Sequence, residues 1–195
     1  LNRYNKITGL FQNHTANDTQ ADGLTHSSIW CIVKDNQGTL WLGTYFGGVN
    51  YFNPEYEIYT RYSYSSNEKK GLSNPVVGRT IEDKDDNLWI GTEGGGLNYY
   101  NRRTREFKWY RPQEGRNSIS HNNVKALYYD ADKEIIWIGT HLGGLNKLDI
   151  RSGHFTHYRM EEGNPNTLPS DIIRDIIPYK SLLIIATFCV AIISR

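Results

Sequence analysis

The tetrapeptide Trp41-Leu42-Gly43-Thr44 recurs twice at intervals of 48 residues, as Trp89-Ile90-Gly91-Thr92 and Trp137-Ile138-Gly139-Thr140. A Gly-Gly pair follows each copy, and the pairs are Gly47-Gly48, Gly95-Gly96 and Gly143-Gly144. Stepping back 48 residues from Val49-Asn50 leads to Leu1-Asn2, at the start of the chain. The 195 residues are therefore built from a repeated unit, and a fixed period of this length is the signature of a repeat architecture.

Each unit contains four short stretches of strand-forming residues separated by turn residues. In the second complete unit these stretches are Val76 to Glu82, Leu88 to Thr92, Leu97 to Tyr100 and Glu106 to Arg111. No segment keeps the period of an amphipathic helix. Four antiparallel strands in a unit of about 40–50 residues are typical of a β-propeller blade. We therefore expect an all-β propeller of about four blades, either small or partial.

The units lie near residues 1–48, 49–96, 97–144 and 145–177, and the last unit departs from the repeat. Ile184-Ile185-Ala186-Thr187 stands where Trp-x-Gly-Thr is expected, and no Gly-Gly pair follows it. Residues 178–195 are then either degenerate last strands of the same domain or an aberrant apolar tail. The apolar stretch 182–193 is shorter than the ~20 residues of a membrane helix, although the start of such a helix is a third interpretation.

The repeated Trp and Gly residues have physical roles that explain why they recur. A Trp side chain fills the gap between neighbouring twisted sheets with a large apolar surface. The Gly two residues later leaves room for another backbone to approach closely, and the Gly-Gly pair supplies a positive φ at the hairpin. We expect Trp41, Trp89 and Trp137 to be mostly buried and to belong to the core rather than to a ligand site.

Composition and charge narrow the classes of partner. The formal net charge is +1 and Lys and Arg form no dense run, which argues against nucleic acid and against a polybasic membrane patch. The two cysteines, Cys31 and Cys189, form no C-x-x-C metal or redox pattern. A single disulfide between them is one interpretation, and two buried, inert thiols are the one that we favour.

At the repeated residues the chain resembles the two-component regulator propeller repeats. The segments that match that family's unit are Gly71-Leu72-Ser73, Val77, Asp83, Leu88-Trp89-Ile90-Gly91-Thr92, Gly95-Gly96-Leu97 and Tyr100. The resemblance covers residues 1 to about 177. It implies the extracellular, periplasmic sensor region of a bacterial hybrid histidine kinase, notably one that regulates polysaccharide use, attached to the remainder of the sensor kinase.

Propellers of that family usually have seven blades, which bears on how the present termini are arranged. The chain starts at the third strand of a unit (Leu1 to Tyr4) and ends with a first strand (Ile172 to Ile177) and a second. The two termini thus carry complementary halves of one blade. If they pair, the chain is a closed four-bladed ring, and otherwise it is an open arc or it pairs with another chain. The seven blades of the family favour the open arc or pairing with another chain.

One face of the propeller is the candidate binding face. If the first strand of each unit lines the axis, the second-to-third hairpins and the connections between units share one face, where loops converge on a rigid scaffold. The candidate ligand-binding residues there are Tyr45, Phe46, Glu93, His141, His26, Asn74 and His121. Exposed aromatic rings can stack on a sugar, and amide groups can form hydrogen bonds with it. The alternative is that these residues form variable, solvated turns.

No catalytic or metal-binding motif stands out elsewhere. The run Asp83 to Asn87 lacks the Gly and the terminal Glu of an EF-hand, and no histidines are paired at metal spacing. We therefore expect no enzyme, no cofactor and no metal. The expected function is ligand sensing by an extracytoplasmic propeller that responds to a glycan fragment. The alternative is a scaffold for protein interaction or homodimerisation without a small ligand.

Overall fold

The computed structural model of the chain describes residues 1–16, 23–53 and 58–188. Within these ranges the regular secondary structure consists of β-strands and one short 3-10 helix, η1 (Glu68–Lys70). Most of the strands form three four-stranded antiparallel sheets. The prediction of an all-β fold with four-stranded blades is confirmed.

The three sheets are the complete blades, which we call blades I, II and III. The strands of blade I are β3 (Ile29–Lys34), β4 (Leu40–Thr44), β5 (Val49–Asn53) and β6 (Ile58–Tyr62). Those of blade II are β7 (Val77–Glu82), β8 (Leu88–Thr92), β9 (Gly96–Asn101) and β10 (Glu106–Tyr110). Those of blade III are β11 (Val124–Asp130), β12 (Ile135–Thr140), β13 (Leu145–Asp149) and β14 (Phe155–Tyr158).

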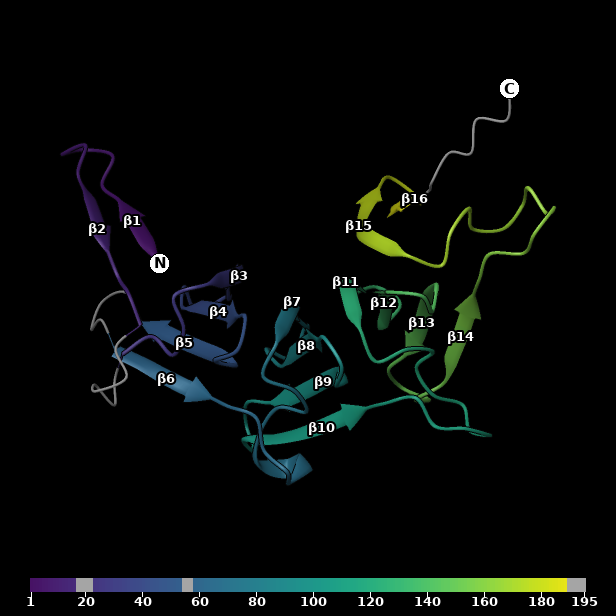
Figure 1. Cartoon of the computed structure of the whole chain (residues 1–195), viewed down its shortest axis with the longest axis horizontal. Helices are drawn as coiled ribbons and strands as arrows, with labels where there is room; N and C mark the ends of the chain where they lie inside the picture. Colours follow the sequence, from purple (N-terminus) through teal and green to yellow (C-terminus); the bar gives the residue numbers. More distant parts are fainter. Residues whose placement is uncertain (17–22, 54–57, 189–195) are drawn as a thin grey trace.

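Two further hairpins lie at the ends of the chain. The N-terminal hairpin pairs β1 (Asn2–Tyr4) with β2 (Phe11–Asn13), and the C-terminal hairpin pairs β15 (Ile173–Tyr179) with β16 (Leu182–Thr187). Among the described residues, neither hairpin pairs with the other. Figure 1 shows them at the two ends of an open arc, with the complete blades between them. The described chain is therefore an open arc, as expected, and not a closed four-bladed ring.

The register of the C-terminal hairpin identifies its place in the repeat. Ile173 pairs with Thr187, and the corresponding pair in blade II is Val77 with Thr92. Ile184 to Thr187 consequently occupy the Trp-x-Gly-Thr positions of the complete blades. This stretch is the degenerate strand pair of the first interpretation, at least as far as Phe188. Residues 189–195, with Cys189, lie outside the described residues.

The core lies between successive blades rather than within any one sheet. The first strands β3, β7, β11 and β15 follow one another around the inside of the arc, each in contact with the next (Figure 1). Trp41 and Trp89 are 2% and 1% exposed and sit in the two clusters between complete blades. Trp137 is only partly buried, because the hairpin that follows it has no third and fourth strand to cover it.

The Gly of each Trp-x-Gly-Thr segment is the point where the next blade approaches most closely. A Cβ atom on Gly91 would lie 2.6 Å from a methyl carbon of Val124, the first residue of the next blade. The same holds for Gly43 against Val77, at 2.7 Å, and Gly139 faces Ile173 in the same way. These glycines are therefore required by the spacing between sheets, as the sequence predicted. Cys31 lies at the same contact and is buried with a free thiol.

We predict that Gly91→Val destabilises the protein by about 1–3 kcal/mol, because the added side chain overlaps Val124 and forces the two blades apart. Chemical denaturation measures the effect as a lower midpoint. The control is Thr60→Val, which places the same side chain on an exposed strand position of blade I. Equal midpoints for Gly91→Val and the control would show that the close approach is not required.

Candidate binding face

The second-to-third hairpins of the blades and the connections between blades lie on one face, which we call the hairpin face. The hairpin glycines donate backbone hydrogen bonds to the connection that leads into the next blade, from Gly48 to Pro75, from Gly96 to Asn122 and from Gly144 to Asp171, at 2.7–3.1 Å. The sequence predicted that these hairpins and connections share one face. Seven candidate residues from three blades therefore share one surface, although they do not form one site.

Four aromatic rings gather at the blade I end of the hairpin face. Tyr45 stacks on Trp30 with centroids 4.9 Å apart and meets Phe46 edge-on at 4.7 Å, and His26 lies 6.3 Å from Tyr45. Trp30, Tyr45 and Phe46 are 49%, 39% and 58% exposed. The structure thus brings together three of the predicted residues and adds Trp30. We call these four residues the aromatic group.

Charged and imidazole side chains occupy the equivalent positions of the next blades. Glu93 on the hairpin of blade II forms an ion pair with Lys125 on the first strand of blade III. His121 and His141 lie close enough for their charges to interact, and burial together with His141 and Arg159 lowers the pKa of His121 below its usual value. The Nδ1 atom of His141 is buried and has no hydrogen-bond partner among the described residues.

The sequence analysis did not identify Trp30 and Lys125 as candidate binding residues. Each is the second residue of the first strand of its blade, and those strands have the apolar character of core strands. Their equivalent in blade II is Gly78, so the position is not repeated. Each sits where the register of the first two strands shifts, next to the hairpin of its own or the preceding blade. The sequence could have revealed this position, because a core position is expected to carry similar residues in every blade and this one does not.

The predicted residues on the connections also have a local structural role. A ring nitrogen of His26 accepts a hydrogen bond from the backbone N–H of Ser28, and His121 does the same for Asn123. Asn74 uses its Oδ1 atom in the same way. These side chains cap the turn into each first strand, as Asx-type turns do. Their polar character therefore has a structural cause independent of any ligand.

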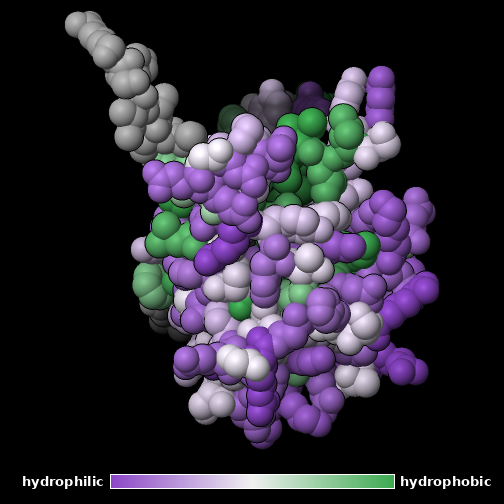
Figure 2. Space-filling view, turned by 90° about the vertical axis from the view of Figure 1, so that its right-hand side faces the viewer, coloured by the Kyte–Doolittle hydropathy of each residue, from purple (hydrophilic) through white to green (hydrophobic). Residues whose placement is uncertain are grey.

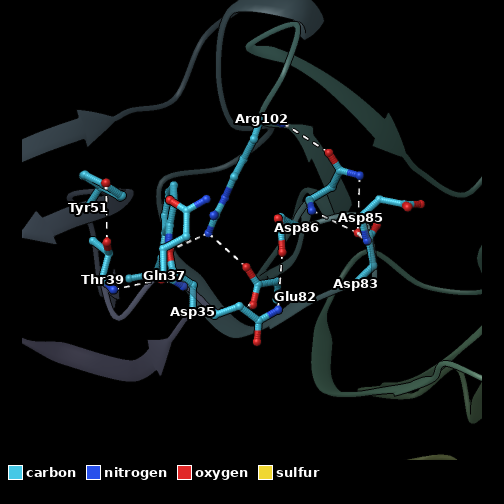
Figure 3. Close-up of polar contacts among 12 residues, drawn as sticks. Asp35, Gln37, Thr39, Tyr51, Glu82, Asp83, Asp85, Asp86 and Arg102 are labelled. Atoms are coloured by element: carbon cyan, nitrogen blue, oxygen red, sulfur yellow. Dashed lines mark hydrogen bonds and ion pairs between the residues drawn. The ribbon is translucent and has the colours of Figure 1, made fainter.

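A charged cluster lies on the opposite side of blades I and II, between their first-to-second turns (Figure 3). Arg102 contacts Asp35 at 2.7 Å and Glu82 at 3.2 Å, and its guanidinium lies 4.9 Å from the centroid of the Trp41 ring. The Asp35 side chain is fully buried and also accepts a hydrogen bond from the indole N–H of Trp41 at 2.8 Å. We call Asp35, Glu82 and Arg102 the turn cluster, and the sequence did not reveal it.

The two carboxyl groups of the turn cluster have pKa values shifted in opposite directions. Burial raises the pKa of Glu82 above its usual value, since the neighbouring Arg102 only partly offsets the cost of a charge there. Burial opposes ionisation of Asp35 as well, but hydrogen bonds from Trp41, the Thr39 backbone and Arg102 outweigh it and lower the pKa of Asp35. The cluster joins blade I to blade II, and within it Glu82 Oε1 and Arg102 Nε are buried without a hydrogen-bond partner among the described residues.

The run Asp83 to Asn87 forms the turn between β7 and β8. Asp83 accepts hydrogen bonds from the backbone N–H groups of Asp85 and Asn87 and from the indole of Trp89. No group of three or more His, Cys, Asp or Glu side chains within residues 1–16, 23–53 and 58–188 is placed to hold a metal ion. In the same ranges no helix has the length and apolar character needed to cross a membrane.

Comparison with protein families identifies the repeats. A family model described as the two component regulator propeller matches residues 23–46, 71–94 and 118–141. Each match runs from the connection that precedes a blade, through its first two strands, to the hairpin face. The first two strands of blades I, II and III therefore match the two-component regulator propeller repeat. A search of curated proteins found no match to the chain.

Solved structures share the propeller architecture of this repeat segment. The extracellular domain of BT3049 from B. thetaiotaomicron, described as a hybrid two component system, is 28% identical with a TM-score of 0.71, and the match covers 82% of this chain and 22% of that one. The extracellular domain of BT4673 from the same organism, described as a one component system, is 23% identical with a TM-score of 0.75, and the match covers 95% and 23%. The chain thus spans about a quarter of either domain.

A more distant structure shows the same fold in an enzyme. Virginiamycin B lyase from Staphylococcus aureus is 12% identical with a TM-score of 0.61, and the match covers 98% of this chain and 63% of that one. At this identity the likeness concerns the fold alone, and the propeller fold by itself does not decide between binding and catalysis.

We predict that Arg102→Ile destabilises the protein by about 3 kcal/mol at neutral pH, because it leaves the buried Asp35 carboxylate without its cation. Isoleucine is the residue that the repeat itself has at the equivalent position, Ile150. The control is the exposed neighbour Arg103→Ile, which should change stability by no more than about 0.5 kcal/mol. Urea denaturation at neutral pH measures both.

The pH dependence of that difference tests its cause. The folded-state pKa of Asp35 lies below the usual 3.8, so its charge adds stability that is present above that pH and lost as the pH falls through the folded-state value. Without Arg102 this pKa rises, so the difference in stability between the two proteins should shrink as the pH falls and vanish only below the folded-state pKa of Asp35, which lies under 3.8. A difference that stays the same at low pH would contradict the ion-pair explanation.

Proposed function

We propose that this chain is a ligand-sensing extracytoplasmic segment of a two-component signalling sensor. Three matches to the two-component regulator propeller model support the proposal, as does the similarity to the extracellular domain of a hybrid two component system. The partner within the signalling protein is the remainder of a sensor kinase, and the expected location is the periplasm. The role proposed for these blades is to bind rather than to catalyse.

The proposed ligand is a fragment of a glycan, and the aromatic group is the observation that carries this part. Trp30, Tyr45 and Phe46 form an exposed aromatic surface on a rigid blade, beside the ring nitrogens of His26. The apolar face of a sugar ring packs on aromatic rings, while its hydroxyls need hydrogen-bonding groups at the edges. Glu93, Lys125 and His141 supply such groups further along the hairpin face.

The second candidate function is a scaffold for protein interaction or dimerisation without a small ligand. An exposed apolar surface at each end of the arc favours it, since both end hairpins carry large exposed apolar side chains. Aromatic residues on the hairpin face are equally suited to a protein partner, because Tyr and Trp are enriched at protein interfaces. The two candidates differ in whether free oligosaccharides bind.

We predict that oligosaccharides shift the NMR resonances of Tyr45, Phe46, Glu93 and His141 more than those of the Asp83–Asn87 turn on the opposite side. The shifts should follow a saturable curve for at least one member of a panel of neutral and acidic glycans. Tyr45→Ala combined with Phe46→Ala should weaken binding by ~10-fold or more, the cost of losing a stacked aromatic contact.

The matched control for this titration is Tyr179→Ala. Tyr179 is a similarly exposed aromatic residue at the end of β15, next to the turn into β16 and away from the hairpin face. The control should leave the affinity unchanged. A panel that gives no shifts, or shifts confined to the Asp83–Asn87 turn, would contradict glycan sensing at this face and favour the scaffold.

A further inference from the structure

A cleft of about 590 Å³ lies between blades I and II, at the end of the two sheets opposite the hairpin face. Tyr51, Thr60 and Tyr62 of blade I line one side of it, and Tyr100 and Arg105 of blade II line the other. Binding sites for small molecules have volumes of about 300–1,000 Å³. The cleft is therefore large enough for one small ligand.

The cleft is bounded by a complete blade on each side, which sets it apart from the two ends of the arc. Figure 2 looks onto the C-terminal end and shows apolar side chains gathered among polar ones, where β15 and β16 pair with no third strand among the described residues. Blades I and II each have four strands, and their first strands, β3 and β7, are in direct contact. The shape of the cleft thus follows from two complete sheets.

Two tyrosine hydroxyls from opposite sides of the cleft form a hydrogen-bonded pair. The hydroxyl oxygens of Tyr62 and Tyr100 are 2.9 Å apart, so one hydroxyl donates to the other. The pair has two O–H groups and uses one in this bond, which leaves the other available to a ligand. Burial and the hydrogen bond with Tyr100 raise the pKa of Tyr62, so its hydroxyl keeps its proton at neutral pH.

Arg105 supplies a positive charge to the lining of the cleft. Its side chain is exposed, and no ion pair in the described part of the chain involves it. Its charge acts on Tyr62, where it partly offsets the effect of burial on the pKa. The other arginine of the lining, Arg102, is already paired with Asp35 and Glu82. The charge that is available to a ligand is therefore that of Arg105.

The acidic groups of this region lie outside the cleft. The carboxylates of the turn cluster are almost fully buried against Arg102. Figure 3 shows Asp85 and Asp86 on one side of Arg102 and Tyr51 on the other. The described residues that line the cleft include no Asp or Glu. A guanidinium and a hydroxyl donor in such a lining suit a carboxylate, since charged donors form short, strong hydrogen bonds with carboxylate oxygens.

Aromatic rings form much of the remaining surface. Trp41 lies at the base of the cleft, where Tyr51 meets its ring edge-on at a centroid distance of 4.8 Å and Tyr62 stacks on it at 5.8 Å. Tyr51 and Tyr62 are half-buried, so part of each ring is open to the cleft. Aromatic rings pack on other rings in offset or edge-on arrangements. A flat ring that carries the carboxylate therefore fits this surface better than a bare anion.

We propose that this cleft is a binding site for an aromatic carboxylate, separate from the glycan surface on the hairpin face. The carboxylate binds the guanidinium of Arg105 and the available hydroxyl of the Tyr62–Tyr100 pair. The ring of the ligand packs against Tyr51 and Tyr62. Because these partners come from both sheets, the ligand bridges blades I and II.

The contact between blades II and III has the same scaffold without these groups. The residues that correspond to Trp41, Tyr51 and Tyr62 are Trp89, Tyr99 and Tyr110. Leu148 stands in place of Tyr100, and Gly153 stands in place of Arg105. Lys108 stands in place of Thr60, and its Nζ atom lies 4.6 Å from the centroid of the Tyr110 ring. The repeat therefore provides a substitution, Thr60→Lys, that covers the tyrosine ring and is compatible with the fold.

NMR titration of the 195-residue chain with three probes tests the proposal. Benzoate has the ring and the charge, benzamide has the ring without the charge, and acetate has the charge without the ring. We expect saturable shifts with benzoate, and binding of benzamide and acetate at least ~10-fold weaker, since each lacks one of the two contacts. The shifts from benzoate should centre on Tyr62, Tyr100 and Arg105 and spare Tyr45 and Phe46.

The charge is tested by Arg105→Gln, which should weaken benzoate binding by ~10-fold or more because it removes the cation. The matched control is Arg103→Gln, since Arg103 is exposed in the same turn and does not line the cleft. The control should leave the affinity unchanged. Both side chains are exposed, so circular dichroism of both variants should match that of the unchanged chain.

The substitution Thr60→Lys separates a built cleft from a general attraction between charges. A lysine there should lie over Tyr62, as Lys108 lies over Tyr110, and weaken benzoate binding by ~10-fold or more although it adds a positive charge. The matched control is Thr156→Lys, the same change at the equivalent exposed position of blade III. It should leave the affinity unchanged.

Saturable benzoate binding that both cleft variants weaken, and that both controls leave intact, supports the site. A titration without saturable shifts overturns the proposal, as does acetate that binds as tightly as benzoate. Tighter binding to the Thr60→Lys variant overturns it as well, because simple charge attraction then explains the result. Shifts centred on Tyr45 and Phe46 overturn it by placing the ligand on the hairpin face. Because benzoate is not a glycan, the result is independent of the oligosaccharide titration.

Discussion

Contact between the faces of neighbouring sheets is the interaction on which this structure depends. Each blade is a single sheet that cannot bury its own faces, so its stability comes from the blades on either side. The contact is tight where the Gly of Trp-x-Gly-Thr meets the first strand of the next blade, as Gly91 meets Val124. Beside it, the adjacent Trp89 fills the outer part of the gap. The same pair of residues must therefore recur at every complete interface, and this requirement produces the 48-residue signature.

Because that contact recurs, the sequence alone was enough to predict most of the fold. The strands of blade II agree with the predicted stretches to within one residue at each end. The fourth unit was harder to interpret, since Ile184 replaces the Trp and Ala186 replaces the Gly. Its strands still form, because alternating apolar residues and the tight turn at Lys180 suffice for a hairpin. The sequence did not show whether the terminal hairpins pair with each other, because this depends on which strands the edges of the terminal sheets contact in space.

The parts of the molecule that the sequence did not predict are those that break the repeat. Arg102 reaches Asp35, 67 positions earlier in the chain, and no local pattern records such a pairing. At the equivalent place between blades II and III, Ile150 packs against the cluster around Trp89. One interface is thus closed by an apolar side chain and the other by a buried ion pair. Both solutions fill the same space, so the repeat tolerates either.

The same distinction separates scaffold from candidate function on the hairpin face. His26, Asn74 and His121 differ in type, yet each accepts a hydrogen bond from the backbone two residues later, so the turn explains all three. The next variable position is different, because Trp30, Gly78 and Lys125 share no structural role. Only Trp30 joins exposed rings, and only Lys125 makes an ion pair with the preceding blade. A scaffold constraint would make these positions alike, so their divergence shows that the packing of the blades does not fix the residue there, and loops on a rigid scaffold are where proteins vary most.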